Sequence, residues 1–210
     1  MAGPAYTRLD VDERRRQLLE LGADLFTRFA YDEISMAGIA REAGISKSLL
    51  YHYFPSKQAY FQATLAAAAD ELRLITEPAE GQPPLEALLG SLDAYLAWIE
   101  EHETAYRKLL QSAGSVPEVR ELVEGIRSTT ADRIVAGLPF PDEPPARARA
   151  AVLGWLWFMD GACLEWLDRR AFTREELKGM LLGTLLGALT AAGASVPLQR
   201  EALDMSESGA

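Results

Sequence analysis

Residues 34–54 of this chain read ISMAGIAREAGISKSLLYHYF, and two short helical patterns meet within them. In the first pattern, Ile39, Ala40 and Ala43 recur at helical spacing and give the segment one apolar face. Gly44 follows and supplies the positive-φ position at which a helix commonly ends. The first helix is therefore expected to stop at this glycine.

A second helix is expected to begin at Ser46, because a serine hydroxyl suits the N-cap position. Its apolar anchors are Leu49, Leu50 and Tyr53. Two helices joined by so short a turn form a helix-turn-helix, whose second helix fits the major groove of DNA. No acidic residue occurs between Glu42 and Asp70, which suits a surface that approaches phosphates. A buried helical hairpin without any DNA-binding role would show a similar apolar pattern.

From Arg14 to Leu65 the chain resembles the DNA-binding domain of the TetR family of transcriptional regulators. The residues that carry the resemblance are Leu18-Leu19, Ala23, Leu25-Phe26, Ser35, Ile39-Ala40, Ala43-Gly44-Ile45-Ser46, Leu50-Tyr51-His52-Tyr53-Phe54 and Ser56-Lys57. Ala30 departs from the family, which usually has glycine there, so the first helix is expected to end differently. Ser48 is a second departure, and its hydroxyl could donate a hydrogen bond.

The composition bounds the kinds of chemistry that the chain can perform. It has 210 residues, of which 49% are hydrophobic, enough to bury a sizeable core. Its single cysteine, Cys163, excludes an intramolecular disulfide and suits a reducing compartment. Together with His52 and His102 it forms no metal-ligand cluster, and we expect no metal and no cofactor. The N-terminus lacks the pattern of a secretory signal, so a cytoplasmic protein is expected.

Charge is unevenly distributed along the chain. The net charge is −10, yet residues 1–60 contain eight basic and eight acidic residues. The remaining 13 basic and 23 acidic residues account for the whole negative charge. A neutral head in front of an acidic body would help to orient the head toward DNA.

Helical periodicity recurs along the chain and no strand pattern occurs, so the expected fold class is all-α. An N-terminal three-helix helix-turn-helix DNA-binding domain is expected to precede a C-terminal helical bundle for ligand binding and dimerisation. The predicted divisions are a flexible arm over 1–9, the DNA-binding domain over 10–55, a connecting helix over 56–76, the ligand-binding and dimerisation domain over 77–200, and a flexible tail over 201–210.

The last helix contains an uncharged run of twenty residues from Gly179 to Leu198, long enough to suggest a membrane span. Glycine, alanine, serine and threonine dilute this run and Pro197 breaks it, so close packing against a partner helix is the preferred interpretation. The family resemblance implies that the last two helices pair with those of a second subunit. The residues expected at the dimer interface are Gly179, Leu182, Gly183, Leu186 and Gly187, with Leu185 and Leu189 nearby.

Seven residues are candidates for contact with double-stranded DNA. They are Ser35, Ser46, Lys47, Ser48, Tyr51, His52 and Lys57. Lys47 lies near the start of the second helix, where side chains commonly meet bases. By family resemblance, Ser35, Tyr51, His52 and Lys57 are expected to contact phosphates. Leu50 and Phe54 are expected to belong to the core.

Aromatic side chains in the body could line a pocket for a small-molecule effector, as the family resemblance implies. The candidate pocket residues are Tyr95, Trp98, Tyr106, Trp155, Phe158, Met159 and Trp166. The alternative is that each of them belongs to the helical core. Asp160 and Glu165 interrupt an apolar helix, so they are expected either to meet a ligand or to form ion pairs.

These features predict a TetR-like transcriptional regulator, most simply a repressor. It would bind a near-palindromic operator as a homodimer and be released by an effector. A regulator without an effector is the alternative. An enzyme is not expected, because no nucleophile with a base, no metal cluster and no phosphate-binding loop is found in the sequence.

Overall fold

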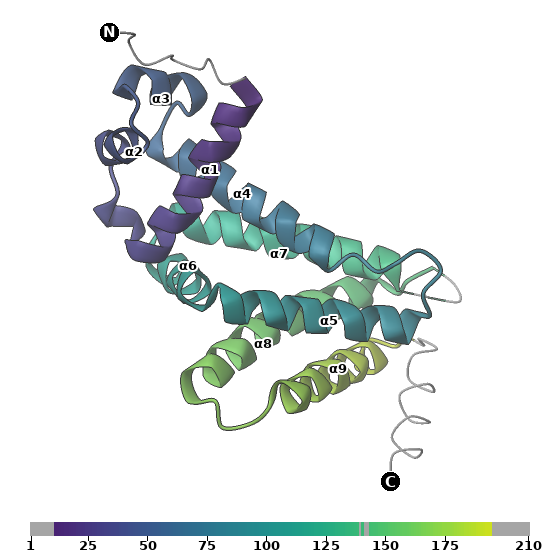
Figure 1. Ribbon diagram of the computed structural model, residues 1–210. Helices are drawn as coiled ribbons and strands as arrows, with labels where there is room; N and C mark the ends of the chain where they lie inside the picture. The colour runs from purple at the N-terminus through teal and green to yellow at the C-terminus, as the bar shows by residue number, and fades with distance from the viewer. Residues whose placement is uncertain (1–10, 139, 141–142, 195–210) are drawn as a thin grey trace, which may run out of the picture. The chain divides into compact units, whose positions relative to one another are not determined.

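The computed structural model describes residues 11–138, 140 and 143–194, and every regular element in these ranges is helical (Figure 1). The elements are α1 Val11–Arg28, a short 3-10 helix η1 Tyr31–Glu33, α2 Met36–Glu42, α3 Lys47–Tyr53, α4 Lys57–Ile75, α5 Pro84–Glu101, α6 Glu103–Ser115, α7 Pro117–Gly137, α8 Ala146–Arg169 and α9 Arg174–Ala191. The prediction of an all-α fold is confirmed. The expected arm over 1–9 and tail over 201–210 lie outside the described residues.

The chain divides into two compact units. The first comprises Met1–Glu71 and Thr104–Glu118, and the second comprises Leu72–Glu103 and Val119–Ala210. Helix α4 therefore runs from one unit into the other, and α6 enters the first unit after its first residue. The helix-turn-helix thus shares its unit with α6, which lies far from it in sequence.

The first unit is held together where α1 meets α4. Tyr60 is completely buried, and its hydroxyl donates a 2.6 Å hydrogen bond to the carbonyl of Leu18. Burial raises the pKa of Tyr60 far above its ordinary value, so the phenol stays protonated and keeps donating. The rings of Phe26 and Phe61 meet edge to face at 4.4 Å. These contacts join α1 to α4 within the unit that contains the helix-turn-helix.

Helix α1 ends without a left-handed residue, as the departure at Ala30 led us to expect. Ala30 is extended, with φ −70° and ψ 157°. Its amide donates to the side chain of Glu33 at 2.7 Å, which closes the short η1 turn. No glycine is required there, because this turn is made by an ordinary extended residue and a carboxylate cap.

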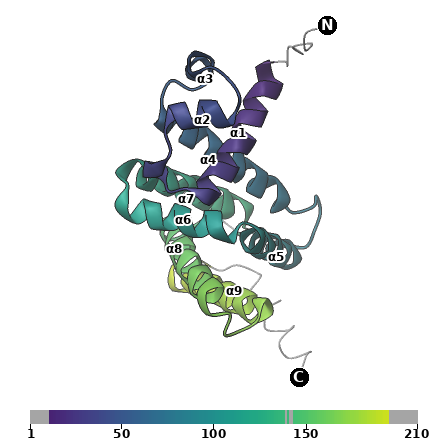
Figure 2. The same cartoon turned by 60° about the vertical axis from the view of Figure 1, so that its left-hand side comes forward.

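In the second unit, α8 and α9 form an antiparallel pair in Figures 1 and 2. The indole of Trp155 donates to the carbonyl of Leu181 at 2.8 Å, and that of Trp166 donates to Phe172 at 2.9 Å. The fully buried face of α9 consists of Leu177, Leu181, Leu185 and Leu189. Leu185 and Leu189, which we expected near the dimer interface, instead fill the chain's own interior.

The two carboxylates that interrupt α8 form ion pairs. Asp160 accepts from Arg127 Nε at 2.8 Å and Nη2 at 2.6 Å, with both side chains largely buried. Glu165 pairs with Arg169 one turn along α8, at 2.7 Å in solvent. Burial, with a smaller contribution from Asp160, raises the pKa of Cys163 to about 12, so this thiol is unreactive at neutral pH.

None of the helices in the described ranges is both long enough and apolar enough to cross a membrane, α9 included. The uncharged run predicted to reach Leu198 continues past residue 194, so its last four residues lie outside the described part of the chain.

Candidate nucleic-acid interface

The turn between α2 and α3 has the geometry that its sequence predicts. Gly44 adopts φ 64°, and the amide of Ile45 reaches back to the carbonyl of Ala40 at 3.0 Å. This pattern closes the end of α2 in the manner of a Schellman cap. The Ser46 hydroxyl then accepts from the Leu49 amide at 3.1 Å and starts α3.

Buried anchors hold α3 in place. Leu50 is completely buried and Phe54 is 2% exposed. The Phe54 ring meets the Tyr60 ring edge to face at 4.9 Å, which connects the end of α3 to α4. As predicted, Leu50 and Phe54 belong to the core. A helix anchored in this way has little freedom left to lose on binding a partner.

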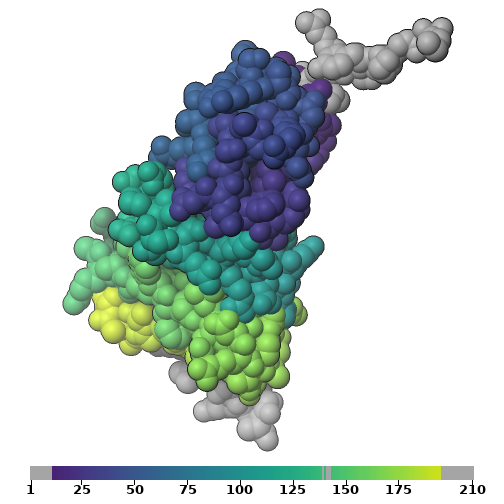
Figure 3. All heavy atoms as spheres, turned by 90° about the vertical axis from the view of Figure 1, so that its left-hand side faces the viewer, coloured from purple at the N-terminus to yellow at the C-terminus, as the bar shows by residue number. Residues whose placement is uncertain are grey.

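The opposite side of α3 is open to solvent. Lys47, Ser48, Tyr51 and His52 are all exposed, and Tyr51 retains 42% of its accessible surface. Figure 3 shows the molecule from the side on which α2 and α3 lie in Figure 1. The Lys47 ammonium lies 5.7 Å from the centroid of the Tyr51 ring, one turn away. Four side chains with polar groups therefore extend from a rigid helix.

Two predicted DNA-contact residues also serve as helix caps. The Ser35 hydroxyl accepts from the Gly38 amide at 3.1 Å, and the Ser46 hydroxyl caps α3 and lies 3.0 Å from that of Ser48. Accepting a backbone N–H leaves the hydroxyl proton of a serine available. Both residues could therefore donate to a phosphate while they cap their helices.

Lys57 is bound within the first unit. Its ammonium donates to the carbonyl of Tyr31 at 3.1 Å and lies 4.1 Å from the centroid of the Tyr31 ring. An ammonium has three N–H donors, so this bond leaves two of them for a phosphate. Contact of Lys57 with DNA stays a prediction, and the structure shows a second role for it as a link between η1 and α4.

Arg15 is a candidate that the seven predicted DNA-contact residues do not include. It is exposed on α1, and its guanidinium lies 5.5 Å from the centroid of the Phe54 ring, beside the C-terminal end of α3. Its neighbour Arg16 is instead engaged by Glu13 and Glu20. The run of three arginines was visible in the sequence, but only the fold distinguishes the one near α3.

Comparison with known proteins gives two matches to family models. The model described as "Bacterial regulatory proteins, tetR family" matches residues 18–64, and "Tetracyclin repressor-like, C-terminal domain" matches residues 84–187. A solved TetR-family transcriptional regulator from Streptomyces coelicolor is 32% identical, with a TM-score of 0.71 over 88% of this chain and 83% of that one. The chain belongs to the TetR family.

Two further relatives agree with this assignment. The HTH-type transcriptional activator FasR of Mycolicibacterium smegmatis is 31% identical over 110 residues, which are 50% of this chain and 49% of that protein. The chain thus spans about half the length of this curated relative. A transcriptional regulator from Pseudomonas aeruginosa PAO1 has the same fold, with a TM-score of 0.68 at 19% identity over 90% of this chain and 96% of that one. TetR-family proteins are DNA-binding regulators, and this chain is a TetR-family transcriptional regulator.

The seven residues predicted to line an effector pocket in this TetR-family protein do not share one environment. The indole N–H groups of Trp155 and Trp166 are hydrogen-bonded to backbone carbonyls within the α8–α9 pair and its connecting turn. The side chain of Phe158 is 38% exposed. Tyr106 belongs to the first unit and the other six to the second. A surface cavity of about 220 Å³ lies between α7 and α8, lined by Glu124, Arg127, Ser128, Leu153 and Trp157, and it includes none of the seven.

Trp98 is the candidate whose hydrogen-bond donor is left unsatisfied within the described part of the chain. Its buried Nε1 has no hydrogen-bond acceptor among the described residues. Its ring stacks on that of His102 at 4.4 Å with an interplanar angle of 20°. A buried donor without a partner is costly, so a ligand that accepts this hydrogen bond would gain from it.

The outer face of α8 and α9 lacks packing partners. A side chain built at Gly179, Gly183 or Gly187 would meet nothing within 4 Å. Met180 on the same helix is 41% exposed. Leu182 and Leu186 are half-buried. We call the surface of these six residues the outer α8–α9 face.

Proposed function

We propose that this TetR-family regulator binds a near-palindromic operator as a homodimer, with one α3 in each of two successive major grooves. The observation that carries the proposal is the exposed row Lys47, Ser48, Tyr51 and His52 on an α3 whose opposite side is fully anchored. Lysine, serine and histidine supply hydrogen bonds to base edges or phosphates, and Tyr51 offers apolar contact to a thymine methyl.

The outer α8–α9 face supports the homodimer. Glycines without neighbours let two helix backbones approach closely, and the exposed Met180 would lose water on association. A two-fold axis through this face would present two recognition helices and select an operator with matching symmetry. The division into DNA-binding, connecting and dimerisation segments at residues 55, 76 and 200 belongs to the same proposal.

We propose further that a small molecule bound in the second unit releases the operator, and that the regulator acts as a repressor. The unsatisfied donor of Trp98 supports a ligand site of this kind. A regulator without an effector is the second candidate, and it is favoured by the tryptophans whose donors are already satisfied. The relative FasR is named a transcriptional activator, whereas we propose repression for this chain.

Selection of bound sequences from random double-stranded DNA at physiological salt tests the proposal. We expect an enriched near-palindrome whose half-sites lie about one helical turn apart. Small molecules that displace this site from the protein would then identify the effector. Binding that vanishes with rising salt and enriches no sequence would contradict the proposal, because it would reflect phosphate attraction alone.

Replacing Lys47 by alanine tests its predicted role at base edges. We expect the variant to lose about 1–3 kcal/mol on the selected site and to discriminate less between that site and single-base changes. An equal loss on every sequence would reassign Lys47 to phosphate contact. Unchanged affinity on all of them would remove it from the interface. Replacement by arginine is the matched control, because it keeps the charge and the donors.

A further inference from the structure

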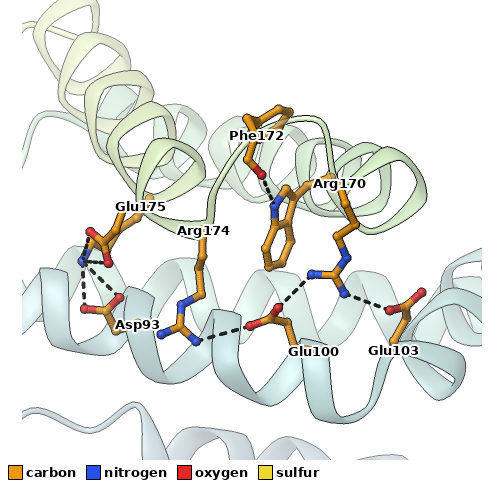
Figure 4. Close-up of polar contacts among 9 residues, drawn as sticks. Asp93, Glu100, Glu103, Arg170, Phe172, Arg174 and Glu175 are labelled. Atoms are coloured by element: carbon orange, nitrogen blue, oxygen red, sulfur yellow. Dashed lines mark hydrogen bonds and ion pairs between the residues drawn. The ribbon is translucent and has the colours of Figure 1, made fainter.

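Three cationic side chains, one at the end of α8 and two near the start of α9, contact three carboxylates on α5 and at the start of α6 (Figure 4). Arg174 donates to Glu100 at 3.3 Å, and Lys178 donates to Asp93 at 3.0 Å and pairs with Glu175 at 2.8 Å. Burial lowers the pKa of Lys178, but its hydrogen bonds to the two carboxylates outweigh burial and leave that pKa above its ordinary value. These contacts hold α9 against α5.

Arg170 is the third of these cations, and its backbone is unusual. It caps α8 with φ 47° and ψ 34°, and no other non-glycine residue in the described ranges has a positive φ. Glycine is the favoured residue at this kind of cap, because a Cβ is strained there. An arginine at such a position needs other contacts that compensate for the strain, and its side chain can supply them.

The Arg170 guanidinium makes three separate contacts. Nη1 donates to Glu100 at 2.8 Å, Nη2 donates to Glu103 at 3.0 Å, and the group lies 4.4 Å from the centroid of the Trp166 ring. Trp166 is itself held by its bond to the carbonyl of Phe172. We call Arg170 with Glu100 and Glu103 the Arg170 clasp.

The Arg170 clasp spans a break in the helical chain. Glu100 lies in the last turn of α5, whereas Glu103 is the first residue of α6. His102 separates them as the C-cap of α5, with φ −107° and ψ 26°. One guanidinium thus binds both sides of the bend. From Thr104 onward, α6 belongs to the compact unit that contains the helix-turn-helix.

We propose that Arg170 is a positioning residue that sets the bend between α5 and α6, and that operator affinity depends on this contact. The proposal rests on the operator binding proposed above. The clasp is partly open to solvent, with 42% of the Arg170 side chain exposed and 35% and 36% of the two carboxylates. Ion pairs of this kind are weak and sensitive to salt, so the clasp can open without unfolding the bundle.

The test compares two variants of the full-length protein. R170G removes the clasp and places the favoured residue at the left-handed cap. R169Q is the matched control, because Arg169 is the adjacent residue and pairs with Glu165 on its own helix. Amide hydrogen exchange is measured along α6 and along α8 and α9, and affinity is measured on the selected operator.

In R170G we expect the first amides of α6 to exchange several-fold faster, with α8 and α9 little changed, and operator affinity to fall about 5-fold. R169Q should leave both readouts within about 2-fold, a small effect typical of an exposed pair within one helix. E103Q should change both readouts in the same direction as R170G. The double variant R170G/E103Q should change both readouts little beyond R170G alone, because both substitutions remove the same contact between Arg170 and Glu103.

Three results would overturn the proposal. One is exchange in α6 that is the same in R170G and R169Q. A second is faster exchange throughout α8 and α9, which would mark Arg170 as merely structural. The third is faster exchange in α6 with unchanged operator affinity. If the wild-type protein selects no operator, the proposed function fails, and the exchange comparison alone decides whether Arg170 positions α6.

Discussion

Gly22 shows how closely the first unit is packed at a single residue. It is buried on α1, facing Tyr60 and Thr64 of α4. A Cβ built there would stand 2.9 Å from the Tyr60 hydroxyl and would clash with Thr64 Oγ1. Thr64 is itself buried and donates to the carbonyl of Tyr60, so it has no room to turn away. The absence of a side chain at this position lets α1 and α4 meet.

We therefore expect Gly22→Ala to lower the free energy of unfolding by about 1–3 kcal/mol, because the added methyl overpacks the contact. Gly125→Ala is the matched control in the middle of α7, where a Cβ would meet nothing within 4 Å. It should stabilise the protein by about 0.5–1 kcal/mol, through the helix preference of alanine over glycine. Urea unfolding of both variants measures this, and a loss of stability of equal size in both would refute the packing argument.

At the scale of elements, short polar side chains set where the helices begin. Ser35, Ser46, Ser56 and Thr173 each accept a backbone amide in the first turn of the following helix. At α9 the cap is reciprocal, since Glu176 accepts from the Thr173 amide at 2.7 Å while Thr173 accepts from the Glu176 amide at 3.2 Å. Hydrogen bonds from the backbone and then the side chain of Thr173 lower the pKa of Glu176.

We expect Thr173→Ala to cost about 1 kcal/mol of stability, the usual loss for a missing N-cap. The contribution of Glu176 depends on pH. Because its folded pKa lies below the ordinary 4.5, its stabilising effect is present above pH 4.5 and is lost as pH falls through the folded pKa.

Thermal unfolding of wild type and Glu176→Gln between pH 7 and about pH 3 checks this dependence. The difference in Tm between the two proteins should shrink on acidification, since the wild-type carboxylate becomes neutral as well. A difference that stays constant over this range would show that the charge of Glu176 does not support the cap.

At the scale of the whole molecule, we propose that two copies associate through the outer α8–α9 face. In the isolated chain, Gly183 is exposed and a Cβ built there meets nothing within 4 Å. We expect Gly183→Leu to fold normally and to sediment as a monomer, because the side chain would occupy the space into which the partner helix packs.

Gly125→Leu is the control for this experiment, because Gly125 is equally open but lies on α7, away from the outer α8–α9 face. It should sediment as the wild-type protein does. A Gly183→Leu variant that remains dimeric would place the interface on another surface. A variant that loses its helical content would instead show that Gly183 is needed within its own subunit.

Much of the fold could be predicted because its determinants are local. The turn at Gly44 and the caps at Ser46 and Thr173 all depend on a few adjacent residues. Helical periodicity likewise placed Leu50 and Phe54 in the core. The aromatic pocket was harder to predict, since an apolar stripe looks alike whether it faces a ligand or another helix.

By itself, the sequence determined the order of the helices, the helix-turn-helix and the family, because capping, helical spacing and motif order are properties of neighbouring residues. The tertiary structure alone decided which polar groups are already used. It bonds Lys57 to Tyr31, buries Leu185 and Leu189 inward, and joins Tyr60 to Leu18 across 42 residues and Arg170 to Glu100 across 70. Contacts between residues so far apart depend on how helices pack, and no local pattern encodes that packing.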